Sequence, residues 1–317
     1  MNNKMEKTID ILSPSLNRYK ANLHTHTTVS DGRFSPERIK EIYKSHGYSI
    51  VAFTDHRNCV PHPELNDDSF LALTGMELDF TEIVNGYWSG CVHLNALART
   101  PFARGEYEKM PLDYELINKT VDELHERGFF VVLNHPVWSN MSSDDVLRVK
   151  GTDALEIVNG IGLSWNNYSD DSAHYEYFLR HGGRAIAVAG DDSHKEFEDG
   201  TPHNEYGTTF TTVFAKELSY DAVIDALESG RCYASTGPTF EGITLKGDTL
   251  CVACSNVIGV YVHSKYLTLK TQDVRKSDTI TYTEIDISEI RRSSPYFWVS
   301  IRDKDGGRAW ATPYWFE

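Results

Sequence analysis

Histidines and carboxylates recur along this chain, each at or just beyond the end of an apolar segment. The first case is His24-Thr25-His26, which closes the run 19–24 and precedes Ser30-Asp31-Gly32. Two residues separated by one position on an extended strand face the same side, so both imidazoles could contact one ion. The further residues placed in this way are Asp55, His56, Glu77, His135, Asp192 and His194, and His93 begins the apolar segment 93–98, close to the same edge. Imidazoles and carboxylates together suit Zn, Mn or Fe, and such a series predicts a multinuclear metal site in a hydrolase.

Each of these segments also has an interpretation without a metal. Thr54-Asp55-His56 could cap a helix, and His135-Pro136 could form a structural turn. The carboxylates before His194 could lie in a solvated loop. Because such interpretations would have to hold at every position at once, metal binding is favoured.

The apolar segments that must position these residues alternate with amphipathic ones. The predicted strands are 19–24, 49–54, 72–78, 93–98, 129–133, 154–158, 185–189 and 208–214. The predicted helices are 36–46, 112–127, 171–181 and 221–228. Continuously apolar strands that alternate with helices indicate a parallel α/β sheet or barrel covered on both faces. In such folds the working residues follow the carboxyl ends of the strands, which is where the candidates occur.

The character of the sequence changes after Ser235-Thr236-Gly237-Pro238. Short β-rich runs separated by turn residues follow, and the segment 303–307 (DKDGG) predicts a hairpin. We therefore expect two domains. A metal-dependent hydrolase domain is predicted at 1–238, and a small antiparallel β-domain at 239–317.

Composition limits the class of partner. The 317 residues carry a net charge of −15, which argues against a nucleic-acid duplex or an anionic membrane as a partner. A small anionic substrate remains compatible, because bound cations would reverse the local field. Five cysteines, no apolar leader segment and no 18-residue apolar run favour a cytoplasmic protein. An oligomer is compatible with the sequence.

Two further features have ambiguous meaning. Cys251 and Cys254 have the spacing of zinc ligands, but no second pair lies nearby, so a place in the buried core is favoured. Trp88, Trp138 and Trp165 follow strand ends. They could form the wall of a pocket or pack in the core.

Taken in order, the histidine and carboxylate motifs resemble those of the polymerase and histidinol phosphatase (PHP) family of metal-dependent phosphoesterases. The matching segments are His24-Thr25-His26-Thr27 with Ser30-Asp31-Gly32, Thr54-Asp55-His56, Gly75-Met76-Glu77, His135-Pro136 and Asp192-Ser193-His194. They lie within residues 20–237. The segments 228–235 and 303–313 also resemble the subgroup that includes carbamate-ester hydrolases of the carbaryl-degrading type.

The resemblance implies a distorted (β/α)7 barrel with two or three divalent metal ions at its carboxyl-end mouth. Carried over by motif, the ligands of the first metal are His24, His26, Glu77 and Asp192. Glu77 then bridges to a second metal held by His93 and His135. A third metal would take Asp31, His56 and His194, and it depends on Asp31, which stands where some members have a histidine.

The expected reaction is hydrolysis of a phosphoester of a small metabolite or nucleotide by a hydroxide that bridges two metals. In this mechanism His194, or a water near it, protonates the leaving group, and Asp55 orients an imidazole. Arg57, Lys195 and Arg33 are the candidates for contact with phosphate. The alternative is a hydrolase of carbamate, amide or ester bonds with the same metals. A third reading is a binding protein that retains the metal site.

Overall fold

The structure is a computed structural model, which describes residues 8–165, 169–195, 204–271 and 279–316. Its helices are α1 (Pro36–Ser45), α2 (Tyr114–Glu126), α3 (Ser143–Arg148), α4 (Gly160–Trp165), α5 (Ser172–Arg180), α6 (Tyr220–Glu228) and α7 (Ser288–Ser293), with a 3-10 turn at Pro63–Leu65. The strands before residue 238 are β1 (Thr8–Leu12), β2 (Asn17–Asn22), β3 (Ile50–Phe53), β4 (Asn58–Cys59), β5 (Leu71–Val84), β6 (Tyr87–Ala98), β7 (Gly105–Glu106), β8 (Met110–Pro111), β9 (Phe129–Asn134), β10 (Ala154–Asn159), β11 (Ile186–Gly190), β12 (Phe210–Ala215) and β13 (Cys232–Ser235). The later strands are β14 (Phe240–Lys246), β15 (Thr249–Val257), β16 (Gly259–Ser264), β17 (Thr268–Thr271), β18 (Ile280–Asp286), β19 (Tyr296–Arg302), β20 (Arg308–Ala311) and β21 (Tyr314–Trp315).

The fold is mixed α/β and is built on one large sheet. Its hydrogen-bonded order is β11-β10-β9-β6-β5-β3-β2-β12-β13-β20-β19-β16-β17. β2, β3 and β5 are parallel, and so are β9, β10 and β11. β6 runs antiparallel to both β5 and β9, so all six parallel strands point the same way. Their carboxyl ends therefore meet at one edge of the sheet.

The expected (β/α)7 barrel is not closed by a strand ladder. β11 lies at one edge of the sheet, while β2, its expected partner, already pairs with β3 and the antiparallel β12. Backbone hydrogen bonds instead join the segment after β2 to the residues that follow β11. Asp192 N donates to the His24 carbonyl (2.9 Å) and His26 N to the Ser193 carbonyl (3.0 Å).

A long antiparallel hairpin, β5–β6, replaces a helical crossover in this sheet. Its turn residues Asn85 and Gly86 have φ values of 52° and 82°, as a tight two-residue hairpin turn requires. β6 runs back alongside the second half of β5. A residue in the middle of β6 therefore lies at the same edge as the residues that follow the parallel strands. His93, paired with Asp79, occupies that position.

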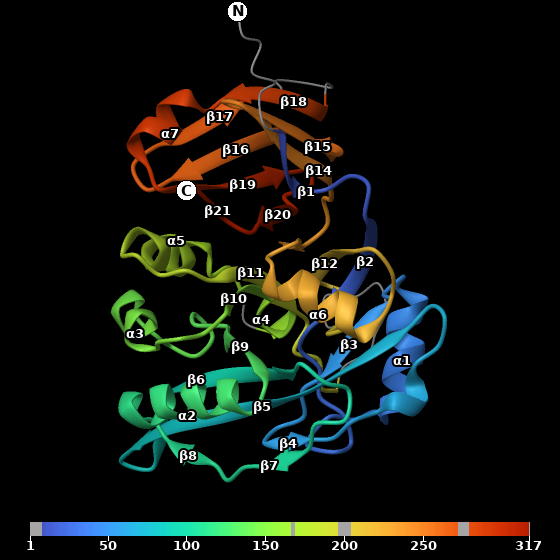
Figure 1. The fold of residues 1–317 in the computed structure, drawn as a ribbon. Coiled ribbons are helices and arrows are strands. Elements are labelled where there is room, and N and C mark those ends of the chain that lie inside the picture. The colour runs from blue at the N-terminus through green and yellow to red at the C-terminus, as the bar shows by residue number, and fades with distance from the viewer. Residues whose placement is uncertain (1–7, 166–168, 196–203, 272–278, 317) are drawn as a thin grey trace, which may run out of the picture.

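The residues after 238 form antiparallel strands that are bonded to the preceding part at two places. β14, β15 and β18 form a four-stranded sheet with β1, from the other end of the chain. β20 pairs with β13 and so continues the large sheet. Figure 1 shows the β1-containing sheet at one end of the molecule and the β5–β6 hairpin with α2 at the other. A separate domain at 239–317 stays a prediction.

Helices cover the sheet through apolar faces that the sequence encodes. α1 begins at the predicted N-cap, where Ser35 accepts a hydrogen bond from Arg38 N, and it buries Ile39, Ile42 and Tyr43. α2 packs its apolar residues against β6 and β9. Cys251 and Cys254 are free and buried, which agrees with the predicted place in the core.

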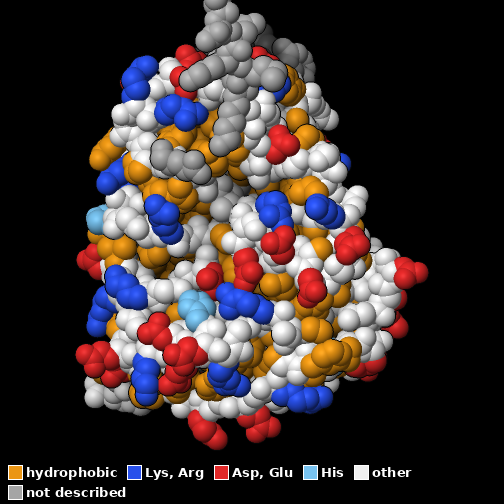
Figure 2. All heavy atoms as spheres, in the orientation of Figure 1, with side chains coloured by type: hydrophobic (Ala, Val, Ile, Leu, Met, Phe, Trp, Pro, Cys, Tyr) orange, Lys and Arg blue, Asp and Glu red, His pale blue; other side chains and the backbone are white. Residues whose placement is uncertain are grey.

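Among the described residues, no helix combines the length and the apolar composition needed to cross a membrane. Figure 2 shows Asp and Glu side chains interspersed with Lys, Arg and hydrophobic ones on one face. Within the described residues of that face, no broad basic area is visible. The absence of a nucleic-acid partner stays a prediction.

One buried carboxylate ties the end of β11 to the loop before β12. Asp191 accepts hydrogen bonds from the backbone nitrogens of Gly207 (2.6 Å), Thr208 (3.1 Å) and Thr209 (2.8 Å), and from the Tyr43 hydroxyl (3.0 Å). Burial raises the pKa of Asp191, and these donors counteract that rise. The carboxylate thus fixes the segment that leads directly into Asp192.

We expect Asp191→Ala to lower the free energy of unfolding by about 3 kcal/mol, because it leaves several buried donors unpaired. Urea denaturation measures the effect. Asp225→Ala is the control, since that side chain is 71% exposed, and it should cost under about 0.5 kcal/mol. Equal midpoints for the two variants would contradict the anchoring role.

Candidate metal centre

The predicted histidines and carboxylates converge at the carboxyl edge of the parallel strands. His24 and His26 follow β2, His56 follows β3, and Glu77 lies within β5. Asp31 lies in the loop after β2, and the rest come from β6, the end of β9 and the segment after β11. Among the described residues, ligand atoms within 4.8 Å of one another form four overlapping groups. These are His24/His26/Glu77/Asp192, Glu77/His93/His135, His26/Asp31/His56/His194 and His24/His135/Glu156.

The first group is buried and compact. His24 Nε2 lies 3.2 Å from both Glu77 Oε1 and Asp192 Oδ1. His26 Nε2 lies 3.3 Å from Glu77 Oε2 and 3.1 Å from Asp192 Oδ1. Ligands about 2.1 Å from a tetrahedral ion are about 3.4 Å from one another. The spacing of this group therefore suits four donors to one divalent ion.

The second group shares Glu77 with the first. Glu77 Oε1 lies 3.0 Å from His93 Nδ1 and 3.4 Å from His135 Nε2. All three residues come from neighbouring strands or strand ends, β5, β6 and β9. A carboxylate common to two groups of donors is the arrangement that bridges two metal ions.

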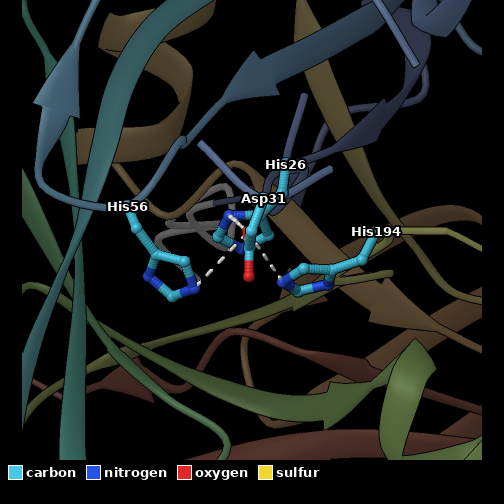
Figure 3. Close-up of side chains that lie close together, drawn as sticks. All are labelled: His26, Asp31, His56 and His194. Atoms are coloured by element: carbon cyan, nitrogen blue, oxygen red, sulfur yellow. Dashed lines mark ion pairs between the residues drawn. The ribbon is translucent and has the colours of Figure 1, made fainter. Parts of the chain in front are cut away.

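The third group is more open. Asp31 Oδ1 lies 3.6 Å from His194 Nε2 and 3.9 Å from both His56 Nε2 and His26 Nδ1. Figure 3 shows the carboxylate of Asp31 pointing between the rings of His56 and His194. Asp31 is 52% exposed, in contrast to the buried Glu77 and Asp192. His26 joins this group through its second ring nitrogen, which the sequence did not predict.

Unpaired polar atoms test whether these residues fit metal ions. Six buried atoms of the proposed ligands have no hydrogen-bond partner within the described part of the chain. They are His24 Nε2, His26 Nδ1, His26 Nε2, His56 Nδ1, His135 Nε2 and Asp192 Oδ1. Each such atom costs about 1–3 kcal/mol when it is left unsatisfied. Since these atoms lie on the sides of the rings and carboxylate that face one another, the residues fit divalent cations.

The charges at the centre follow from burial and mutual contact. Burial opposes ionisation of Glu77, but His24, His93 and His56 hold its pKa well below the usual range. Burial also opposes protonation of His26, yet the adjacent carboxylates of Asp192 and Glu77 raise its pKa to about 9. Burial lowers the pKa of His56 to about 4, and His26 adds to this effect. The carboxylates are therefore anionic and attract positive charge.

Outer contacts orient the rings. His24 Nδ1 lies 3.2 Å from Glu156 Oε1, and His135 Nδ1 lies 3.0 Å from Ser139 Oγ. In each ring the opposite nitrogen then faces the centre. Metal-bound histidines are commonly oriented in this way by a second partner on the other ring nitrogen. Sequence reasoning missed Glu156. Its signal was a carboxylate inside the otherwise apolar strand β10.

Asp55 has a different role from the expected one. The sequence predicted that it orients an imidazole. Its oxygens instead accept from Thr27 N (2.7 Å), Thr27 Oγ1 (2.9 Å), Ser30 N (3.1 Å) and Ser30 Oγ (2.8 Å). Asp55 therefore fixes the turn that presents Asp31.

The three predicted phosphate contacts lie in different places. A cavity of about 230 Å³ opens on the centre. Its described lining residues are Asp31, His56, Glu77, His93, Trp138, Ile161, Asp192, His194, Lys195 and Glu205. Arg57 pairs with Asp79 and lines a neighbouring cavity of about 430 Å³ that shares His56. Arg33 is not among the described residues of either cavity, and its guanidinium lies over the Phe34 ring.

Strained backbone is concentrated at this centre. Arg57, His135 and Asp192 have φ values of 58°, 29° and 54°, in a region that residues other than glycine rarely adopt. Arg57 directly follows a proposed ligand, His135 directly follows β9, and Asp192 lies two residues after β11. Such strain persists where the surrounding structure holds it, and it is common at functional sites.

Comparisons with known proteins give distant likenesses. No protein-family model matches the chain, and no curated protein matches it. A solved structure described as a two-domain protein containing a predicted PHP-like metal-dependent phosphoesterase, from Bacteroides vulgatus, is 16% identical with a TM-score of 0.47 and covers 100% of this chain and 99% of its own. An amidohydrolase from Chromobacterium violaceum, with bound sulfate and no metal, is 16% identical (TM-score 0.41; 56% of this chain, 89% of its own). A structure assigned as a metal-dependent phosphoesterase from Bifidobacterium adolescentis is 13% identical (TM-score 0.43; 67% and 96%). The resemblance to carbaryl-type hydrolases stays a prediction, and the chemistry of this chain is inferred from its own side chains.

We expect Glu77→Gln to retain less than half of the Zn or Mn that the wild type binds, because the amide keeps the size but removes the charge shared by two groups. Elemental analysis after dialysis measures the metal content. Glu123→Gln, whose side chain is 50% exposed on α2, should keep the wild-type content. Wild-type content in Glu77→Gln would contradict the shared-ligand assignment.

Glu156→Gln should weaken metal affinity about tenfold, since the amide polarises the His24 ring less than a carboxylate does. Competition with a chromophoric chelator measures this change. Glu289→Gln, at an exposed position of α7, is the matched control. An affinity equal to that of the control would contradict a role for Glu156 in metal binding.

Proposed function

We propose that this protein is a metal-dependent hydrolase that cleaves a phosphoester bond of a small anionic molecule. The observation that carries the proposal is the buried Glu77, which belongs at once to the group with His24, His26 and Asp192 and to the group with His93 and His135. Two or three Zn, Mn or Fe ions held there would lower the pKa of water to about 7 and offset the charge of a phosphoryl group.

The chain's own groups supply binding and orientation. Lys195 lines the cavity and offers an ammonium group to a phosphate oxygen. The Nδ1–H of His194 donates to the Asp192 carbonyl at 2.7 Å, so its Nε2 lone pair faces Asp31 and the cavity. This orientation suits His194 as a ligand, which leaves protonation of the leaving group to a water near it.

A second reaction uses the same centre. Lys195 is the single Lys or Arg among the described residues that line the cavity, because Arg57 faces Asp79 and the neighbouring cavity. A substrate with less negative charge than a phosphoester needs fewer cations. This observation favours hydrolysis of a carbamate, amide or ester bond as the alternative.

His26→Ala and Asp192→Asn should each abolish metal-dependent hydrolysis, at least 10³-fold in kcat/KM, because both remove donors from the first group. The assay compares p-nitrophenyl phosphate, nucleotides and an aryl carbamate after chelation and reconstitution with Mn or Zn. His181→Ala, an exposed histidine that follows α5, should leave activity unchanged. Hydrolysis retained by His26→Ala would overturn the proposal, and turnover of the carbamate alone would select the second reaction.

A further inference from the structure

The cavity at the metal centre has one apolar wall. Trp138 and Ile161 are the apolar residues among its described lining, and the others are titratable. The Trp138 ring centroid lies 5.0 Å from that of His135 and 5.9 Å from that of His93. An indole therefore stands directly beside two proposed ligands of the second metal.

The loop that carries Trp138 is held from two sides. Val137 N donates to Asp171 Oδ1 (2.8 Å), and the Ser139 carbonyl accepts from Cys91 N (3.2 Å). The amide of Asn140 bonds to the backbone of β6 as well, through the Ser89 carbonyl (3.1 Å). The backbone that carries the indole is thus fixed before any ligand arrives, which lowers the entropic cost of binding.

The apolar wall continues outward from the cavity. The Trp88 ring centroid lies 6.3 Å from that of Trp138, and Trp88 is 49% exposed. Beyond it, Ile83 pairs with Trp88 across the β5–β6 hairpin and is 59% exposed. Exposed apolar side chains beside a reactive centre are typical of a binding surface.

We propose that Trp138, with Trp88 behind it, binds a planar aromatic group of the substrate next to the bond that is cleaved. Planar rings gain from offset or edge-to-face contact with an indole as well as from apolar burial. The polar end of the substrate then lies toward Lys195, which also lines the cavity. This inference rests on the proposed hydrolase function and specifies its substrate class as aryl esters.

The test measures binding of phenylphosphonate and methylphosphonate to the full chain reconstituted with Mn, by calorimetry. The wild type should bind phenylphosphonate about tenfold more tightly. Trp138→Leu should bring the ratio close to one and leave methylphosphonate affinity unchanged, whereas Trp138→Phe should keep most of the preference. Tyr266→Leu, which removes an aromatic ring 68% exposed between β16 and β17, is the control and should keep the wild-type ratio.

No preference for phenylphosphonate in the wild type, including no binding of it, would overturn the inference, as would an unchanged ratio in Trp138→Leu. Hydrolysis of phenyl and methyl phosphate separates the two proposals. Turnover of both at equal kcat/KM would overturn the aryl preference but keep the hydrolase. A preference in binding that depends on Trp138, with turnover of neither phosphate, would support the surface and count against phosphoester hydrolysis.

Discussion

Glu77 is a buried carboxylate with ring nitrogens of five histidines around it, at 3.0–3.4 Å. Asn134 Nδ2 donates to the same carboxylate at 2.9 Å. A buried anion is costly unless positive charge compensates it, and neutral imidazoles bring lone pairs rather than charge. Protonation of some rings can compensate in part. Divalent cations compensate fully and also satisfy the lone pairs that face inward.

The architecture can be understood as the means of meeting this requirement. Parallel strands bring their carboxyl ends to one edge, and the antiparallel β6 brings His93 to that edge from the opposite direction. His135 and Asp192 adopt left-handed backbone to turn inward. Three carboxylates behind the centre hold its parts in place. Glu156 fixes a ring, Asp55 fixes a turn and Asp191 fixes a loop. The cost of strain and of buried charge is therefore spread over many contacts.

The sequence predicts the centre better than it predicts the sheet. Strand ends followed by His or Asp could be found because apolar runs are visible and most of the histidine donors follow one closely. Glu156 could not be found by motif, because it lies within a strand and acts through His24. The role of Asp55 and the place of Arg57 depend on side-chain direction, and spacing does not encode this. The open sheet was missed because closure depends on whether β11 or β12 pairs with β2, a choice made by tertiary contacts.

Strand pairing also sets an order of events during synthesis. β2 carries the chain into His24 and His26, but its partner β12 lies far along the sequence, and β1 pairs with the still later β14. At about 5–20 residues per second, a ribosome would take about 10–40 seconds to supply β12 after β2 has emerged. During that interval the first histidine pair has neither Asp192 nor a complete sheet around it. The nascent chain thus exposes imidazoles to cellular metal ions before the full set of ligands has been synthesised.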